Sequence, residues 1–340
     1  MNTESGRGDA GSSRLSCVGE SGESPPPLEE TRRRPMYTAM SSAVVPAGSR
    51  LDAAYDLVEA HVRRLDKDRW LAGLYAPEEQ RRHLYALYAF SAEIGRIRDL
   101  VSDPLPGEIR ARWWIDTLTG ERREEGAAHP IAAALLDTID RFSLPVADFE
   151  CLVEARVFDL YDEAMPDLAA LEDYCRDTSA TLIRLAARVL ADGRDLGVDE
   201  VAAHAGVAYG LTTTMRALPH HTARGQVFLP LDVLSRHGLS RGDVLVGKCG
   251  PGLLAALAEL RGRAREELEA TRRLIRTIPP EVAPAFLPVS LVDLCLGHME
   301  RRGFDPYRIP VERPQWRRQW RLWRAARRAR KAAERYWQQM

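Results

Sequence analysis

Four polar side chains that can take part in binding or catalysis lie within one short stretch, residues 206–230. They are Arg216, His220, His221 and Arg224. The stretch begins with small and apolar residues and contains Pro219 just before the two histidines. Because a proline stops or kinks a helix and leaves carbonyls that need partners, we predict a helix that ends here at the rim of a pocket. An arginine at such a rim can hold an anion, and imidazoles suit transition metals such as zinc.

The composition excludes several classes of protein. The chain has 340 residues, and its 48 Lys and Arg against 49 Asp and Glu give a net charge of -1, which indicates no overall preference for a polyanion. The five cysteines form no CxxC pair, which indicates a reducing compartment and argues against a structural zinc or a disulfide framework. We find no uninterrupted apolar run of about 18 residues and no apolar signal segment, which predicts a non-secreted, cytoplasmic protein.

The elements that position these side chains are predicted to be helices. From residue 49 to residue 310, apolar residues recur at spacings of three and four, as in the predicted helices 81–101 and 130–142, and alternating patterns are nearly absent. We therefore predict an all-α, single domain of about ten helices. Residues 1–48 are rich in Ser, Gly, Pro and Glu and are predicted to be a disordered tail, unless the true start of the chain is Met36 or Met40.

Three stretches carry a resemblance to a known family. Residues 77–99 read PEEQRRHLYALYAFSAEIGRIRD, residues 171–187 read LEDYCRDTSATLIRLAA, and residues 210–234 read GLTTTMRALPHHTARGQVFLPLDVL. The first and third resemble the two signatures of the squalene/phytoene synthase family, and the second is similar to the family's Tyr-Cys helix. The resemblance implies an isoprenoid-synthase-like helical bundle around a central apolar cavity. In that family, carboxylates on two facing helices hold Mg²⁺ ions that bridge to the diphosphate of a prenyl substrate, as suits a hard cation with oxygen ligands.

The chain departs from the family at the acidic positions of both signatures. The replacements are Gly95, Arg96, Ala217, His220 and His221, and Asp99 alone keeps its acid. Imidazole does not replace a carboxylate toward magnesium, and neighbouring histidines on a helix point apart. We therefore predict no metal site and no cofactor.

The residues that replace the acids of the second signature form a recognisable pattern. Residues 215–221 read Met-Arg-Ala-Leu-Pro-His-His, and residues 227–230 read Val-Phe-Leu-Pro. This pattern is similar to a divergent branch of the family that includes mitochondrial complex I assembly factor 6. The resemblance implies a role in respiratory complex assembly, with complex I subunits as partners, in place of condensation.

The predicted ligand-binding residues each have a structural alternative. They are Arg216, Arg224, Tyr88, Asp99, His220 and His221. If the protein is active, the predicted catalytic acids are Asp99, Glu93 and Asp159. The alternatives are that the arginines only bond helix-end carbonyls, that the tyrosine packs in the core, and that each acid pairs with a neighbouring side chain.

Residues 311–340 stand apart as a basic, Trp-rich amphipathic helix. Trp316, Trp320 and Trp323 share one face at helical spacing, beside cations such as Arg317 and Arg324. An aromatic stripe beside a cationic face is typical of a helix that lies on an anionic membrane, here peripherally on its inner face. The alternative is a terminal helix docked by its tryptophans with solvated arginines. Nucleic acid is not expected, because no nucleic-acid-binding module accompanies the segment.

These patterns leave three functions open. The first is a non-catalytic protein of the synthase fold that acts in complex I assembly. The second is a head-to-head prenyl transferase of the phytoene or squalene synthase type, which would condense two allylic isoprenoid diphosphates with Mg²⁺ and with acids recruited from elsewhere. The third is a metal-independent binder of an isoprenoid or phospholipid anion, because the net charge of the rim of the site changes from about minus six to about zero.

Overall fold

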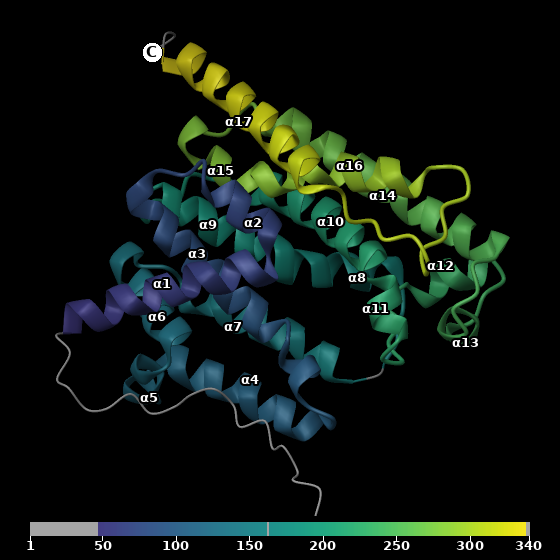
Figure 1. Ribbon diagram of the computed structural model, residues 1–340, viewed down its shortest axis with the longest axis horizontal. Coiled ribbons are helices and arrows are strands. Elements are labelled where there is room, and N and C mark those ends of the chain that lie inside the picture. Colours follow the sequence, from purple (N-terminus) through teal and green to yellow (C-terminus); the bar gives the residue numbers. More distant parts are fainter. Residues whose placement is uncertain (1–46, 162, 338–340) are drawn as a thin grey trace, which may run out of the picture. The chain divides into compact units, whose positions relative to one another are not determined.

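The computed structural model describes residues 47–161 and 163–337. These residues contain helices and turns and no strand, which confirms the predicted all-α class (Figure 1). They belong to one compact unit, residues 45–340. The predicted disordered tail, with Met36 and Met40, lies outside the described residues apart from its last two positions, which open the first helix.

The first half of the unit consists of helices joined by short turns. In order they are α1 (Ala47–Leu65), α2 (Lys67–Gly73), α3 (Glu78–Ile94), η1 (Ile97–Leu100), α4 (Pro104–Thr119), α5 (Arg123–Ala128), α6 (Pro130–Phe142), α7 (Val146–Val157) and η2 (Phe158–Leu160).

The second half contains the longest helices. In order the elements are α8 (Leu168–Cys175), η3 (Arg176–Ala180), α9 (Thr181–Leu190), α10 (Asp199–Arg216), α11 (Leu218–Thr222), α12 (Leu231–Arg236), α13 (Arg241–Leu245), α14 (Pro251–Leu274), η4 (Pro280–Val282), α15 (Ala283–Phe286), η5 (Leu287–Leu291), α16 (Val292–Met299) and α17 (Gln315–Trp337). Short helical turns at the ends of the longer helices make the elements more numerous than the predicted ten.

The local sequence sets the bounds of α6. The helix begins at Pro130, whose fixed φ suits a first turn, and the side chain of His129 accepts a hydrogen bond of 3.3 Å from the backbone N–H of Ala132. It ends at Phe142 because Ser143 adopts a left-handed conformation with φ of 48°. The apolar face of α6 packs against α1 and α3. The predicted and observed bounds coincide.

A close approach of backbones holds α10 in the centre of the unit. A Cβ added to Gly206 would lie 2.4 Å from Cβ of Ala180, and one added to Gly210 would lie 2.4 Å from Sγ of Cys175. Only glycine leaves room for α8 and the π-helical turn η3 at these two positions. On its other side α10 packs along α14. The small residues at the start of the stretch 206–230 therefore serve packing.

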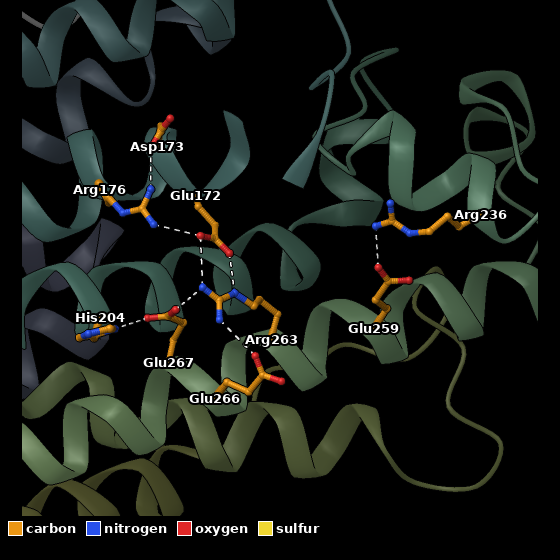
Figure 2. A network of polar contacts seen from close by, with 9 residues as sticks. All are labelled: Glu172, Asp173, Arg176, His204, Arg236, Glu259, Arg263, Glu266 and Glu267. Atoms are coloured by element: carbon orange, nitrogen blue, oxygen red, sulfur yellow. Dashed lines mark hydrogen bonds and ion pairs between the residues drawn. The ribbon is translucent and has the colours of Figure 1, made fainter. Parts of the chain in front are cut away.

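A buried network of charges ties α14 to α8 and α10 (Figure 2). Arg263 on α14 donates to Glu172 on α8 at 2.6 Å and also pairs with Glu267 on its own helix. Glu172 accepts a second bond of 2.9 Å from Arg176, and His204 on α10 lies 2.5 Å from Glu267. The two glutamates are 7% and 5% exposed, so their charges depend on these partners.

One segment, residues 280–299, is long and apolar enough to cross a membrane by its length and composition. It consists of η4, α15, η5 and α16, and 61% of its apolar 18-residue window is buried inside the unit. It escapes a search for uninterrupted apolar runs because prolines, Glu281 and Asp293 interrupt it. Its neighbours include α9, α10 and α17, so we interpret it as core.

The C-terminal helix docks on this segment by a face without tryptophan. Leu322 of α17 is fully buried against Leu287 and Leu291 of η5. Trp316, Trp320 and Trp323 remain 62%, 51% and 46% exposed. The alternative in which the helix docks by its tryptophans is therefore wrong, because the small and aliphatic residues of the opposite face make that contact.

Candidate functional site

The cavity beside the two signature stretches is polar. It has a volume of about 680 Å³ and is lined from α2, α10 and the segment 306–312 that precedes α17. Its cationic lining residues are Arg64, Lys67, Arg69, Arg156, Arg216, Arg308 and Arg318. Its acidic ones are Asp66, Asp68 and Glu312. This charged lining differs from the apolar cavity that the resemblance implies, because α2 and the segment before α17 bring charged side chains to it.

Arg69 enters the cavity from the start of α2. Asp66 caps this helix by accepting from the backbone N–H of Arg69 at 3.0 Å, and its other oxygen accepts from the guanidinium at 2.7 Å. The guanidinium also stacks on the rings of Tyr209, at 4.9 Å, and Tyr88, at 5.7 Å. A helix cap and two aromatic faces thus hold one positive charge in place.

Arg156 at the end of α7 is held by a second set of contacts. It donates to Asp159 at 3.1 Å and to the hydroxyl of Tyr174 at 2.6 Å, and that hydroxyl donates to Asp159 at 2.7 Å. The backbone carbonyl of Asp159 accepts from Gln226 at 2.7 Å. Burial raises the pKa of the Asp159 carboxyl, although Arg156 and Tyr174 oppose the shift. Asp159 therefore fixes an arginine and is not among the residues that line the cavity.

Asp68 links the cavity to the C-terminal helix. One carboxylate oxygen accepts from Arg216 of α10 at 3.3 Å, and the other accepts from Arg318 of α17 at 2.8 Å. Asp68 itself is only 6% exposed. A single buried carboxylate thus holds the arginine predicted from the signature and one from a helix 250 residues further along.

The remaining acids near the first signature are paired outside the cavity. Asp99, in η1, forms an ion pair with Arg224. Glu93 lies 2.7 Å from His61 and 3.4 Å from Arg96. Burial would raise the pKa of Glu93, but the hydrogen bond and charge of His61 lower it. Neither acid lines the cavity.

The two histidines have different surroundings. His220 is exposed and lines the cavity. His221 is half-buried and packs on the ring of Phe228 with centroids 4.4 Å apart. Burial, and then the neighbouring His220 and Arg156, lower the pKa of His221 to about 4. At neutral pH this imidazole carries no charge.

These residues do not fit a magnesium clamp. Within residues 47–161 and 163–337, no group of three or more His, Cys, Asp and Glu side chains is placed to hold a metal ion. Asp66 and Asp68 do reach the cavity from a distant part of the sequence, but arginines engage both of them. Magnesium requires several oxygen ligands free to bind it, and these carboxylates are committed to cations.

The predicted ligand-binding residues other than His221 fall into three groups. Arg216 and His220 line the cavity. Asp99 and Arg224 meet each other away from it, although their signatures are far apart in sequence. Tyr88 is 2% exposed in the core beneath Arg69, which agrees with the packing alternative.

Arg69, Arg156 and Asp68 line the cavity but were not predicted from the sequence. A signal for two of them exists, because residues 66–69 read DKDR directly after the first predicted helix and so place acids and bases within one turn. Nothing in the pattern around Arg156 distinguishes it from other helical arginines.

Three comparisons with known proteins point to one protein family. The family model described as squalene/phytoene synthase matches residues 62–324. The mouse protein NADH dehydrogenase (ubiquinone) complex I, assembly factor 6, is 30% identical over 278 residues, which cover 82% of this chain and 83% of that protein. Phytoene synthase of Thermus thermophilus is 30% identical over 201 residues, or 58% of this chain and 66% of that protein. The crystal structure of squalene synthase HpnC from Alicyclobacillus acidocaldarius superimposes with a TM-score of 0.65 at 22% identity, covering 77% of this chain and 98% of that one.

Proposed function

Because the chain belongs to the squalene/phytoene synthase family, we propose that it is a member without condensing activity, which binds an anionic isoprenoid or lipid in its cavity and takes part in the assembly of respiratory complex I. The chain is similar both to assembly factor 6 proteins and to a phytoene synthase. The choice between an assembly function and a synthase function depends on the residues of the site.

One observation carries this proposal: the carboxylates of the family's magnesium clamp are absent or paired. Gly95, Arg96 and Ala217 occupy acidic positions of the two signatures. The remaining acid, Asp99, is neutralised by Arg224. A diphosphate leaves a prenyl substrate readily only when its charge is compensated, and metal ions held by carboxylates supply that compensation in the family. The signature positions of this chain therefore offer no unpaired carboxylate for such ions.

The charge of the cavity supports an anionic ligand without metal. Seven cationic side chains and three acidic ones line it. Arginine binds phosphate oxygens through two parallel hydrogen bonds, and a partly enclosed site strengthens each of them. Ser91 also lines the cavity and carries a hydroxyl that can donate to the same oxygens, whereas the hydroxyls of Thr178 and Thr213 donate to the backbone carbonyls of Tyr174 and Gly210.

An assay of the purified protein tests both parts of the proposal. Geranylgeranyl or farnesyl diphosphate is incubated with the protein and Mg²⁺, and released diphosphate is measured. We expect no release, and turnover comparable to that of phytoene synthase would refute the proposal. Calorimetric titration with inorganic pyrophosphate should give the same affinity with and without Mg²⁺. Arg216→Gln should weaken this binding, whereas the matched surface variant Arg236→Gln should not.

The prenyl transferase remains the second candidate. The observation in its favour is that Asp66 and Asp68 lie in the same cavity, together with the likeness to a phytoene synthase. If these two acids held Mg²⁺, pyrophosphate binding would depend on the metal and Asp68→Asn would abolish it.

The assembly role rests on the names of the relatives and needs its own test. Deletion of the gene from the source organism should lower the NADH oxidation rate of isolated membranes and the amount of assembled complex I, while a quinol-oxidising complex stays unchanged. Re-expression of the wild-type chain should restore both. An unchanged complex I content would refute the assembly role and leave the binding proposal standing.

A further inference from the structure

The C-terminal helix α17 divides its side chains between two faces. On one face Leu322, Ala325 and Ala326 pack on η5 and α2. On the other, Trp316, Trp320 and Trp323 are between 46% and 62% exposed. At 3.6 residues per turn, the three tryptophans lie about 100° to 160° away from Leu322 around the helix axis. The docked face therefore holds the tryptophan face outward.

The arginines of α17 are divided in the same way. Those near the docked face are neutralised: Arg318 pairs with Asp68 at 2.8 Å, and Arg321 pairs with Asp293 at 2.6 Å. Those near the tryptophan face stack on it. Arg317 lies 5.0 Å from the ring centroid of Trp316, Arg324 4.6 Å from that of Trp320, and Arg327 5.4 Å from that of Trp323. In the docked helix, acidic side chains of the domain thus pair with the arginines near the docked face. The arginines near the tryptophan face keep that face cationic.

Two grooves run along the flanks of α17. One, of about 810 Å³, is lined by apolar residues such as Pro284, Leu287 and Ala326 and by Arg327 and Glu281. The other, of about 870 Å³, is lined by apolar residues such as Ile275, Phe286 and Ala325 and by Arg324 and Arg328. Both combine apolar and cationic side chains, as the junction between acyl chains and anionic head groups requires.

We propose that the tryptophan face of α17, defined as Trp316, Trp320, Trp323, Arg317, Arg324 and Arg327, binds the surface of an anionic phospholipid bilayer. The helix lies in the plane of the interface, with its indoles at the level of the head groups and its guanidinium groups on lipid phosphates. This contact goes beyond the cavity function and does not depend on it. The apolar segment 280–299 stays inside the protein, because α17 covers part of it from the membrane side.

The charge of the face selects this occupant over two others. A second copy of the chain would have to bring acidic side chains to the face, and the full chain, with a net charge of -1, has almost equal numbers of acidic and basic residues. A duplex nucleic acid would satisfy the arginines but leave three indoles facing its phosphates. An anionic bilayer satisfies both the charges and the indoles.

Co-sedimentation of the full chain with vesicles tests the proposal. Vesicles of phosphatidylcholine alone are compared with vesicles of phosphatidylcholine and phosphatidylglycerol in equal parts. We expect binding to the anionic vesicles only, lost at high salt, together with a blue shift of tryptophan fluorescence. Because each cation near an anionic surface contributes about 1 kcal/mol, the triple change of Arg317, Arg324 and Arg327 to Gln should weaken binding about 100-fold.

A second triple variant and a matched control separate the face from the rest of the surface. Changing Trp316, Trp320 and Trp323 to Ser should lower binding more than about tenfold, because partial burial of three indoles is lost. The control changes Leu105 and Ile109 to Ser, which are 66% and 64% exposed on α4, and should bind as the wild type does. Thermal unfolding of each variant checks that it is folded. If the tryptophan variant is not folded, vesicle binding by the arginine variant tests the proposal.

Three results would overturn the proposal. The first is failure of the wild-type chain to bind phosphatidylglycerol vesicles. The second is binding by both triple variants at wild-type affinity. The third is a change of oligomeric state or loss of DNA binding in the variants while vesicle binding stays intact, which would assign the face to a second copy or to nucleic acid.

Discussion

Replacing Asp68 by asparagine separates the structural role of the cavity charges from their binding role. Asp68 is buried and holds both Arg216 and Arg318. The change keeps the shape of the side chain and removes one negative charge. It should destabilise the fold and, at the same time, strengthen the binding of an anion in the cavity.

The loss of stability follows from the exposure of the two partners. Removing one member of a fully buried ion pair costs about 3–5 kcal/mol. The side chains of Arg216 and Arg318 are 32% and 17% exposed, so water can partly solvate them once the carboxylate is gone. We therefore expect the free energy of unfolding to fall by about 2 kcal/mol.

The gain in affinity follows from the repulsion that the carboxylate exerts on a bound anion. At a separation of about 10 Å and an effective dielectric constant of about 40, two unit charges interact by about 0.8 kcal/mol. For an anion with about two negative charges the removed repulsion is about 1.6 kcal/mol, which corresponds to a tighter dissociation constant by about tenfold.

Urea unfolding and calorimetric titration with inorganic pyrophosphate measure the two effects. The matched control is Asp293→Asn, because Asp293 also anchors α17, through Arg321 at 2.6 Å, but does not line the cavity. It should lower stability and leave the affinity for pyrophosphate unchanged. Weaker pyrophosphate binding by the Asp68 variant would refute the reasoning, since that result requires the carboxylate itself, or a metal bound to it, to contact the ligand.

Three further changes test the fold around the site. Arg263→Leu removes the cation shared by two buried glutamates, but Arg263 is itself 33% exposed and Arg176 and His204 remain beside them, so the free energy of unfolding should fall by about 2 kcal/mol. Arg236→Leu breaks two more exposed pairs, with Asp232 and Glu259, and should cost under about 1 kcal/mol in the same urea titration. Gly206→Ala pushes a methyl group against η3 and should cost about 1–3 kcal/mol, whereas Gly262→Ala, with open space around its Cβ, should gain up to about 1 kcal/mol in thermal unfolding. Burial, and then Arg82, lower the pKa of His83 to about 4, so the unfolded chain binds a proton that the folded chain rejects. The contribution of His83 to the free energy of unfolding should therefore fall by about 1.4 kcal/mol per pH unit as the pH drops from about 6.5 to about 4, and His83→Gln should lower the slope of the pH profile by that amount while the similar contribution of His221 remains.

Local patterns predicted the helices well where the sequence contains its own boundary signals. The bounds of α6 coincide with the prediction because Pro130 begins it and a left-handed Ser143 ends it. The helix predicted over residues 81–101 instead ends at Ile94 and continues as the separate turn η1. Residues 206–230 were predicted to break at Pro219, whereas α10 ends at Arg216 and the proline lies in the first turn of α11. A proline is tolerated in a first turn, so it marks a helix start as readily as a stop.

Fewer of the cavity residues than of the helices could be predicted from the sequence. The signatures led to Arg216 and to the loss of the family's acids, because those residues lie within recognisable motifs. They did not lead to Arg69 or Asp68, which reach the same cavity from α2. The partners of Asp68 lie 148 and 250 residues away, and no periodicity links positions at such distances.

By itself the sequence determined the helical class, the family and the missing carboxylates, since these follow from local periodicity and from the residue types within short motifs. The tertiary structure decided that the cavity is cationic, that Asp99 is paired with Arg224, and that α17 turns its tryptophans outward. An amphipathic helix with aromatic residues on one side and aliphatic ones on the other can dock by either. The shape and charge of the surface that it contacts decide which face docks. Leu322 packs against Leu287 and Leu291, and Arg318 and Arg321 form ion pairs with Asp68 and Asp293.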